Sequence, residues 1–278
     1  MIIEFLLFLA QPDASGLSPQ PAAAVIEIKE SAEAVFLRCR QEAERGEAAA
    51  IYRLGLCYLE GRGVAADPVK AFDCFRQSSD KGLVFAHYAR AWSCLEGHGT
   101  RKDPAEAFRL FGQAAELGHV ESQYAIAFCQ LEGLGTQADA DAAYRTFKEL
   151  AESGHAGAQY QLGRCFSQGF AVSVDLTAAA NWYRKAAEQN DTEALFALGD
   201  CFMNGDGRSK DKEKGLKLWV QAGNQGLALA QYNVGLCYLR GIGCSRNEMA
   251  GRKWLEKAVE QGDEEAKKTL ASLDKKKG

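Results

Sequence analysis

The sequence predicts an all-α protein, a solenoid built from helix-turn-helix repeats of 36 residues. Three observations support this prediction. A glycine recurs every 36 residues, at Gly61, Gly97, Gly133, Gly169, Gly205 and Gly241. A second glycine follows two positions later in every copy but the fourth, which has Ala171. An aspartate or asparagine then returns with the same period. Self-similarity at one fixed period indicates stacked supersecondary units, so we expect one elongated, monomeric domain.

The N-terminal segment 1–30 precedes the repeats and is predicted to be an apolar segment followed by a linker. Residues 2–10 are apolar apart from Glu4, but no Lys or Arg occurs before Lys29 and nine residues cannot span a bilayer. We therefore expect a cytoplasmic protein without a membrane span. The alternative is a periplasmic or secreted protein, if residues 1–24 act as a signal peptide.

Each repeat is predicted to begin with a helix A, which ends at the Gly-x-Gly pair because glycine adopts the positive φ of a C-cap. The set of residues at one position of the repeat is called a column below. One column holds small residues that let helices approach closely. It comprises Gly55, Ala91, Ala127, Gly163, Gly199 and Gly235. The six repeats are 47–82, 83–118, 119–154, 155–190, 191–226 and 227–262.

A helix B follows in each repeat, and its start is marked by an Asp or Asn that is suited to capping a helix. These residues are Asp67, Asp103, Asp139, Asp175, Asp211 and Asn247. Glu106 is predicted to complete a capping box with Asp103. By the same period, residues 31–46 form a lone helix B that caps the first repeat, and residues 263–278 form a lone helix A that caps the last one. Lys268 takes the usual aromatic position there.

Nine cysteines are present, and five of them occupy one column of helix A. Equivalent residues of stacked helices lie roughly 10 Å apart, whereas a disulfide needs Cα atoms within about 7 Å. Bridges along the column are therefore excluded, which is compatible with a reducing compartment. The 37 acidic and 33 basic residues give a net charge of −4, so nucleic acid is not an expected partner.

The pattern A-x-Y-x-L-G-x-x-Y-x-x-G-x-G-V-x-x-D-P, which begins at Ala50, resembles the Sel1-like repeat, a relative of the tetratricopeptide repeat. The resemblance implies a right-handed α/α superhelix whose concave face is lined by helix A. It also implies an adaptor that brings protein partners together. One branch of the family is linked to penicillin binding and has two cysteines per repeat, eight residues apart. The equivalent pairs, such as Ser79 and His87, contain no cysteine here.

Catalytic and metal-binding roles are not predicted, and no cofactor is expected. His119 and His155 share a column, but a shared metal would require their side chains to converge across about 10 Å. We interpret them as solvated turn residues. The sequence contains no Gly-x-Ser-x-Gly, His-Glu-x-x-His or Cys-x-x-Cys motif.

A partner-binding surface is predicted on the concave face, where helix A carries a stripe at a spacing of four residues. The stripe comprises Tyr52, Leu56, Glu60, Tyr88, Trp92, Glu96, Tyr124, Phe128, Glu132, Tyr160 and Arg164. The tyrosine column can alternatively pack between repeats. Leu56, Trp92 and Phe128 are predicted to face a groove as apolar anchors, beside a rim of glutamates that favours a peptide bearing Lys or Arg.

The predicted function is a non-catalytic scaffold that holds a segment of a protein or peptide partner along helix A. Two alternatives stay open at this point. One is a cell-wall-directed hydrolase of the penicillin-binding or weak β-lactamase kind. The other is an exported protein that acts at a host or cell surface.

Overall fold

The structure is a computed structural model that describes residues 31–275. The predicted apolar segment and linker at 1–30 lie outside the described residues, as do residues 276–278. Within 31–275 the regular structure consists of fourteen α-helices and no strand, which confirms the predicted all-α repeat fold.

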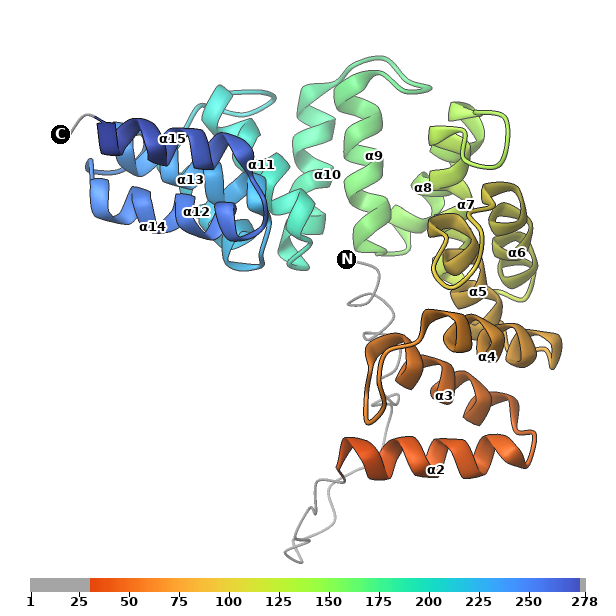
Figure 1. Cartoon of the computed structure of the whole chain (residues 1–278). Coiled ribbons are helices and arrows are strands. Elements are labelled where there is room, and N and C mark those ends of the chain that lie inside the picture. The colour runs from red at the N-terminus through yellow and green to blue at the C-terminus, as the bar shows by residue number, and fades with distance from the viewer. Residues whose placement is uncertain (1–30, 276–278) are drawn as a thin grey trace, which may run out of the picture. The chain divides into compact units, whose positions relative to one another are not determined.

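The chain forms two compact units, one through Ala138 and the other from Asp139 onward. The first contains α2 (Ala32–Glu44), α3 (Ala48–Glu60), α4 (Pro68–Asp80), α5 (Val84–Glu96), α6 (Pro104–Glu116) and α7 (Val120–Glu132). The second contains α8 (Ala140–Glu152), α9 (Ala156–Gln168), α10 (Leu176–Glu188), α11 (Thr192–Asn204), α12 (Lys212–Asn224), α13 (Ala228–Arg240), α14 (Glu248–Glu260) and α15 (Glu264–Lys275). Within each unit, every helix packs on the next helix in the chain (Figure 1).

Helix B begins where the sequence predicts. In all six copies the Asp or Asn side chain accepts a hydrogen bond from the backbone N–H three residues later, as from Lys70 N to Asp67 Oδ1 at 3.0 Å. The predicted capping box is wrong in its second half. The N–H of Asp103 donates to the carbonyl oxygen of Cys94 on helix A, and the carboxylate of Glu106 instead contacts Arg109 and Arg90. The preceding helix has already satisfied the donor that the box would bind.

The Gly-x-Gly pair has two separate roles. The first glycine is a left-handed C-cap in every repeat, with φ between 68° and 91°. The second glycine also has a positive φ, and it lies against the start of the preceding helix B. A Cβ at Gly99 or Gly135 would lie only 1.9 Å from the carbonyl oxygen of Pro68 or Pro104. The second glycine therefore allows close contact between consecutive repeats.

The small column of helix A holds the aromatic residue of helix B in the same repeat. A Cβ at Gly55 would lie 2.7 Å from the ring of Phe75, and one at Gly199 would lie 2.5 Å from Trp219. The predicted close approach is thus made by a ring that packs on a glycine. The packing of this ring outweighs the roughly 1 kcal/mol by which a glycine within a helix is less favourable than alanine.

The terminal helices of the described chain bury one face each. Phe36 and Cys39 of α2 pack on Cys57. At the other end Ala266 of α15 is fully buried beside Leu255, whereas Lys268 is exposed and pairs with Glu265 at 2.7 Å.

All nine cysteines are free thiols, and eight of them are buried. Burial, followed by the neighbouring Cys39 thiol, raises the pKa of Cys57 to about 11. A thiol with so high a pKa is almost entirely protonated at neutral pH and is a poor nucleophile. The buried thiols therefore act as small packing residues.

Candidate functional site

The tyrosine column of the predicted stripe packs on helix B. Tyr52 and Tyr88 are buried, at 9% and 1% exposed. Their rings lie 5.6 Å from Phe75 and 5.7 Å from Phe111, and Tyr160 contacts Tyr183 in the same way at 5.8 Å. These contacts support the packing alternative for Tyr52, Tyr88 and Tyr160. Each ring packs on helix B of its own repeat, and the ring of Tyr88 also contacts His119 of the next repeat. Tyr124 is half-buried on α7.

The next column is less open than predicted. Leu56 is 7% exposed and belongs to the core of the first unit, so it does not face a groove. Trp92 is half-buried, and its ring contacts Phe111 edge-on at 5.5 Å. Asp200 and Trp219 of the fifth repeat are equivalent to Trp92 and Phe111. These two side chains are also in contact, through a hydrogen bond that Trp219 Nε1 donates to Asp200 at 3.1 Å. The column therefore faces helix B of its own repeat, and Trp92 is only partly exposed.

The later members of the stripe differ in exposure. Phe128 is half-buried on α7, and Arg164 is half-buried on α9, where it donates to Gln161 at 2.9 Å. Glu96 and Glu132 are exposed at the ends of α5 and α7. Glu60 is half-buried, and burial raises the pKa of its carboxyl group.

An accessible surface therefore remains at the ends of two helices of the first unit. It consists of the partly exposed side chains of Trp92 and Phe128 together with the exposed side chains of Glu96 and Glu132. We call these four residues the α5/α7 surface.

The interpretation of the two aligned histidines as solvated turn residues is wrong for His119, which is buried, whereas His155 is half-buried. His119 is 8% exposed, its ring lies 4.9 Å from that of Tyr88, and its Nδ1 accepts a hydrogen bond from the N–H of Ser122 at 3.2 Å. His155 caps α9 in the same way, accepting from Ala158 at 3.0 Å. The two imidazoles are thus the N-caps of α7 and α9, and the carboxylate of Asp191 is the N-cap of α11 in the next repeat.

The His119 cap predicts a loss of stability in acid. An imidazole that accepts a hydrogen bond through Nδ1 must be neutral there, and burial lowers the pKa of His119 below its usual 6.5. The unfolded chain binds the proton first, so the free energy of unfolding should fall as the pH decreases below about 6.5. The fall should end at the lower pKa of the folded state.

Urea unfolding at pH 7.5 and at pH 5 checks this prediction. His119→Asn is the matched variant, because Asn247 caps another helix of this chain through a side-chain oxygen that does not titrate in this range. The difference in stability between the two pH values should be smaller in the variant than in the unmodified protein. Equal differences would show that His119 does not titrate on unfolding.

Other groups with shifted pKa values also have structural partners. Burial raises the pKa of Asp191 and of Asp200 to about 6. Asp191 caps α11, and Asp200 accepts a hydrogen bond from Trp219.

Within residues 31–275 there is no group of three or more His, Cys, Asp or Glu side chains placed to hold a metal ion. No helix in that range has the length and apolar character needed to cross a bilayer.

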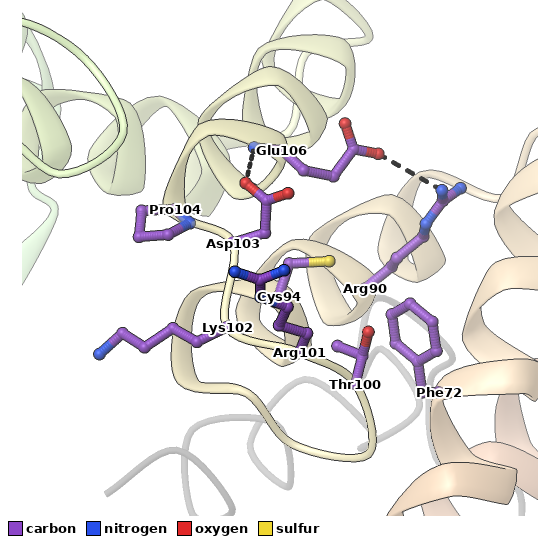
Figure 2. A pocket seen from close by; sticks show the side chains of 9 residues that line it. All are labelled: Phe72, Arg90, Cys94, Thr100, Arg101, Lys102, Asp103, Pro104 and Glu106. Carbon is purple, nitrogen blue, oxygen red and sulfur yellow. Dashed lines mark hydrogen bonds and ion pairs between the residues drawn. The ribbon is translucent and has the colours of Figure 1, made fainter.

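A pocket of about 490 Å³ lies in the first unit, between α4, α5 and the turn that leads into α6 (Figure 2). The lining residues are Phe72, Arg90, Cys94, Thr100, Arg101, Lys102, Asp103, Pro104 and Glu106. Figure 2 shows the guanidinium of Arg90 extending toward Glu106, whereas the ammonium group of Lys102 points away from the other side chains.

This pocket was not predicted from the sequence, although one signal for it was available there. Arg90 is the only charged residue in a column that is otherwise apolar. The other members of that column are Leu54, Ile126, Leu162, Leu198 and Val234. A charged group at a packed position needs partners, so the exception indicates a local feature of the second repeat.

Comparison with known proteins identifies the repeats. The family described as Sel1 repeat matches residues 48–83, 84–119, 120–155, 156–191, 192–227 and 228–263. No curated protein sequence matches the chain.

Solved structures show the same architecture. A Sel1 repeat protein from Oxalobacter formigenes is 28% identical, with a TM-score of 0.72 over 84% of this chain and 68% of that chain. A protective antigen present in uropathogenic Escherichia coli strains, which displays an SLR fold, is 28% identical with a TM-score of 0.66. That match covers 83% of this chain and 50% of the antigen, so this chain spans half of the antigen's length. Immunity protein Pa5087 from Pseudomonas aeruginosa, at 23% identity and a TM-score of 0.50, is similar in fold alone.

Proposed function

Since the chain belongs to the Sel1 repeat family, we propose that it is a non-catalytic scaffold that binds a segment of a protein partner through helix A. The observation that supports this proposal most directly is the α5/α7 surface. Trp92 and Phe128 are partly exposed aromatic residues at equivalent positions of consecutive helices A, and α5 and α7 contribute to one hydrophobic cluster. Partly exposed aromatic residues on a rigid support are typical of the residues that dominate binding energy.

The charge of the surface defines the partner further. Glu96 and Glu132 lie four residues after Trp92 and Phe128, one turn along the same helices. A peptide that inserts an apolar side chain between the two rings would thus place its flanking Lys or Arg near a carboxylate. Such rim charges chiefly increase the association rate and the specificity.

The test begins with affinity capture from the source cell, followed by mass spectrometry of the bound protein. The affinity of this partner is then measured for the unmodified protein and for the double variant Trp92→Leu with Phe128→Leu. Leucine is the natural residue of this column in the first and sixth repeats, at Leu56 and Leu236, so it limits the loss of packing on helix B. The double variant is expected to weaken binding by about 2–4 kcal/mol.

Trp182→Leu provides the control for this experiment. Trp182 is also half-buried, but it lies on α10, which is a helix B. It should leave the affinity unchanged. An equal loss in the control, or an unchanged affinity in the double variant, would place the binding surface elsewhere.

The non-catalytic part of the proposal is supported by the structural roles of the groups that a hydrolase would need. His119, Asp191 and Asp200 each have a capping or packing partner. Incubation of the purified protein with nitrocefin tests the hydrolase alternative directly, and turnover of this substrate would overturn the proposal.

We also propose a cytoplasmic location, which nine free thiols support because disulfides persist in oxidising compartments and not in the cytosol. Fractionation of the source cell tests this location, and recovery from the periplasm or the medium would contradict it.

A further inference from the structure

One wall of the pocket in the second repeat is the half-buried cation Arg90, whose contacts with other residues are long. The side chain of Arg90 is 19% exposed and donates to Ser79 at 3.3 Å and to Asp80 and Glu106 at 3.4 Å each. These distances are long for charge-assisted hydrogen bonds, which are usually about 2.7–2.9 Å. Its Nε is buried and has no hydrogen-bond partner among the described residues.

The carboxylates of the pocket are already engaged by other groups. Glu106 accepts from Nε and Nη2 of Arg109, both at 2.7 Å, so its shorter contacts are with Arg109 and not with Arg90. Asp103 accepts the N–H of Glu106 at 3.0 Å as the cap of α6. Arg90 therefore makes only long contacts with carboxylates, and its Nε–H has no acceptor among the described residues.

The turn beside Arg90 adds further positive charge, and its arginine occurs at that position only in this repeat. Arg101 occupies a column in which the other copies have Ala65, Gln137, Ser173, Ser209 and Ser245. Among residues 31–275, neither Arg101 nor Lys102 forms a hydrogen bond or an ion pair, and both are exposed. The one charged residue of the apolar column, Arg90, and the turn that carries Arg101 and Lys102 thus lie around one pocket.

We propose that this pocket binds a single carboxylate group, held by Arg90 and Arg101 with Lys102 at the rim. The three cationic and two anionic side chains of the lining leave one positive charge in excess, which matches a monoanion. A phosphate dianion concentrates two negative charges on one group and would be repelled by Asp103 and Glu106. A carboxylate group carries a single charge and pairs well with a planar guanidinium.

The walls of the pocket favour a carboxylate carried on an aliphatic stem. Phe72 and Pro104 provide apolar surface, and Thr100 provides both a methyl group and a hydroxyl donor. The volume of about 490 Å³ exceeds that of a carboxylate alone. An acidic side chain of a protein or a free dicarboxylic acid would both meet these requirements, and the experiment distinguishes them. This site is separate from the α5/α7 surface and does not depend on it.

The test is a titration of isotope-labelled full-length protein followed by NMR. The probes are a blocked Ala-Glu-Glu-Ala peptide, its Ala-Gln-Gln-Ala counterpart, succinate and inorganic phosphate. The glutamate peptide is expected to shift the Arg90 Nε–H signal and the amide signals of Thr100 and Cys94, more strongly at low salt. The glutamine peptide should not shift them. Comparable binding of succinate would assign the site to free dicarboxylic acids, and weaker binding would assign it to acidic side chains.

Two variants and one control complete the test. Arg90→Leu introduces the residue that the array itself uses at Leu54, Leu162 and Leu198, so the fold should be retained. Arg101→Gln changes an exposed side chain only. Each should raise the dissociation constant about tenfold or more. The control combines Lys210→Gln with Arg246→Gln, which removes exposed cations from the column of Lys102 in other repeats.

The control should leave binding unchanged. Equal binding of the two peptides, unchanged binding by Arg90→Leu and Arg101→Gln, or tighter binding of phosphate than of either carboxylate would overturn the proposal.

Discussion

Replacing Gly99 with alanine is expected to lower the free energy of unfolding of the first unit by about 3–5 kcal/mol. Two costs combine at this residue. Its φ of 69° is unfavourable for any L-residue with a side chain, by about 1–2 kcal/mol. The added Cβ would also lie 1.9 Å from the carbonyl oxygen of Pro68. That oxygen belongs to the backbone, so α4 would have to move away from the turn.

Gly118→Ala separates the two costs. Gly118 has a φ of 84°, but an added Cβ would meet nothing within 4 Å. Only the conformational cost of about 1–2 kcal/mol should appear there. Urea unfolding of both variants checks the comparison, and similar losses would mean that the contact between repeats adds nothing.

Ala171→Gly tests the same position in the opposite direction. Ala171 is the one non-glycine residue at the second position of the pair, and it has a φ of 58°. Glycine should raise the stability of the second unit by about 1 kcal/mol, because it removes the cost of a left-handed conformation. A decrease would show that the methyl group of Ala171 makes a favourable contact.

Removing residues 263–278 is expected to cause aggregation or a loss of about 3 kcal/mol or more in the stability of the second unit. Helix α15 covers Leu255 and Ala258, both fully buried, and contributes Leu270 and Leu273 to the same cluster. Its loss also breaks the ion pair between Arg252 and Asp274 at 2.7 Å. An apolar face of the last repeat would then be exposed to water.

Deletion of one whole repeat is the informative comparison. Removing 191–226 takes out 36 residues and leaves α10 to pack on α13, which is also a helix A. The stability of a repeat array is approximately a sum of nearest-neighbour terms, so the shortened protein should remain folded. Circular dichroism and urea unfolding measure both deletions. If the larger deletion unfolds the second unit and the smaller one does not, the repeats do not act as separable modules.

The sequence was sufficient for the features that depend on residues close together in the chain. The 36-residue period, the caps at Asp67 and its equivalents and the left-handed glycines such as Gly61 were all predicted. The reason is that capping joins a side chain to a backbone group three residues away, and a positive φ concerns one residue alone. Such chemistry needs no knowledge of what packs against the helix.

Features that depend on residues in different helices were decided by tertiary structure. Leu56 and Tyr88 became core residues, and His119 became a buried cap, because of the neighbours that packing placed beside them. Glu106 contacts Arg109 and Arg90, because the carbonyl oxygen of Cys94 accepts the N–H that a capping box would use.

The pocket follows the same rule. Arg90 was visible in the sequence as an exception, but only the packing of α4, α5 and α6 placed the Arg101 turn beside it. Local backbone geometry is encoded within a few residues, whereas the exposure of a side chain depends on neighbouring helices that lie farther away in the chain, as Phe111 does from Trp92.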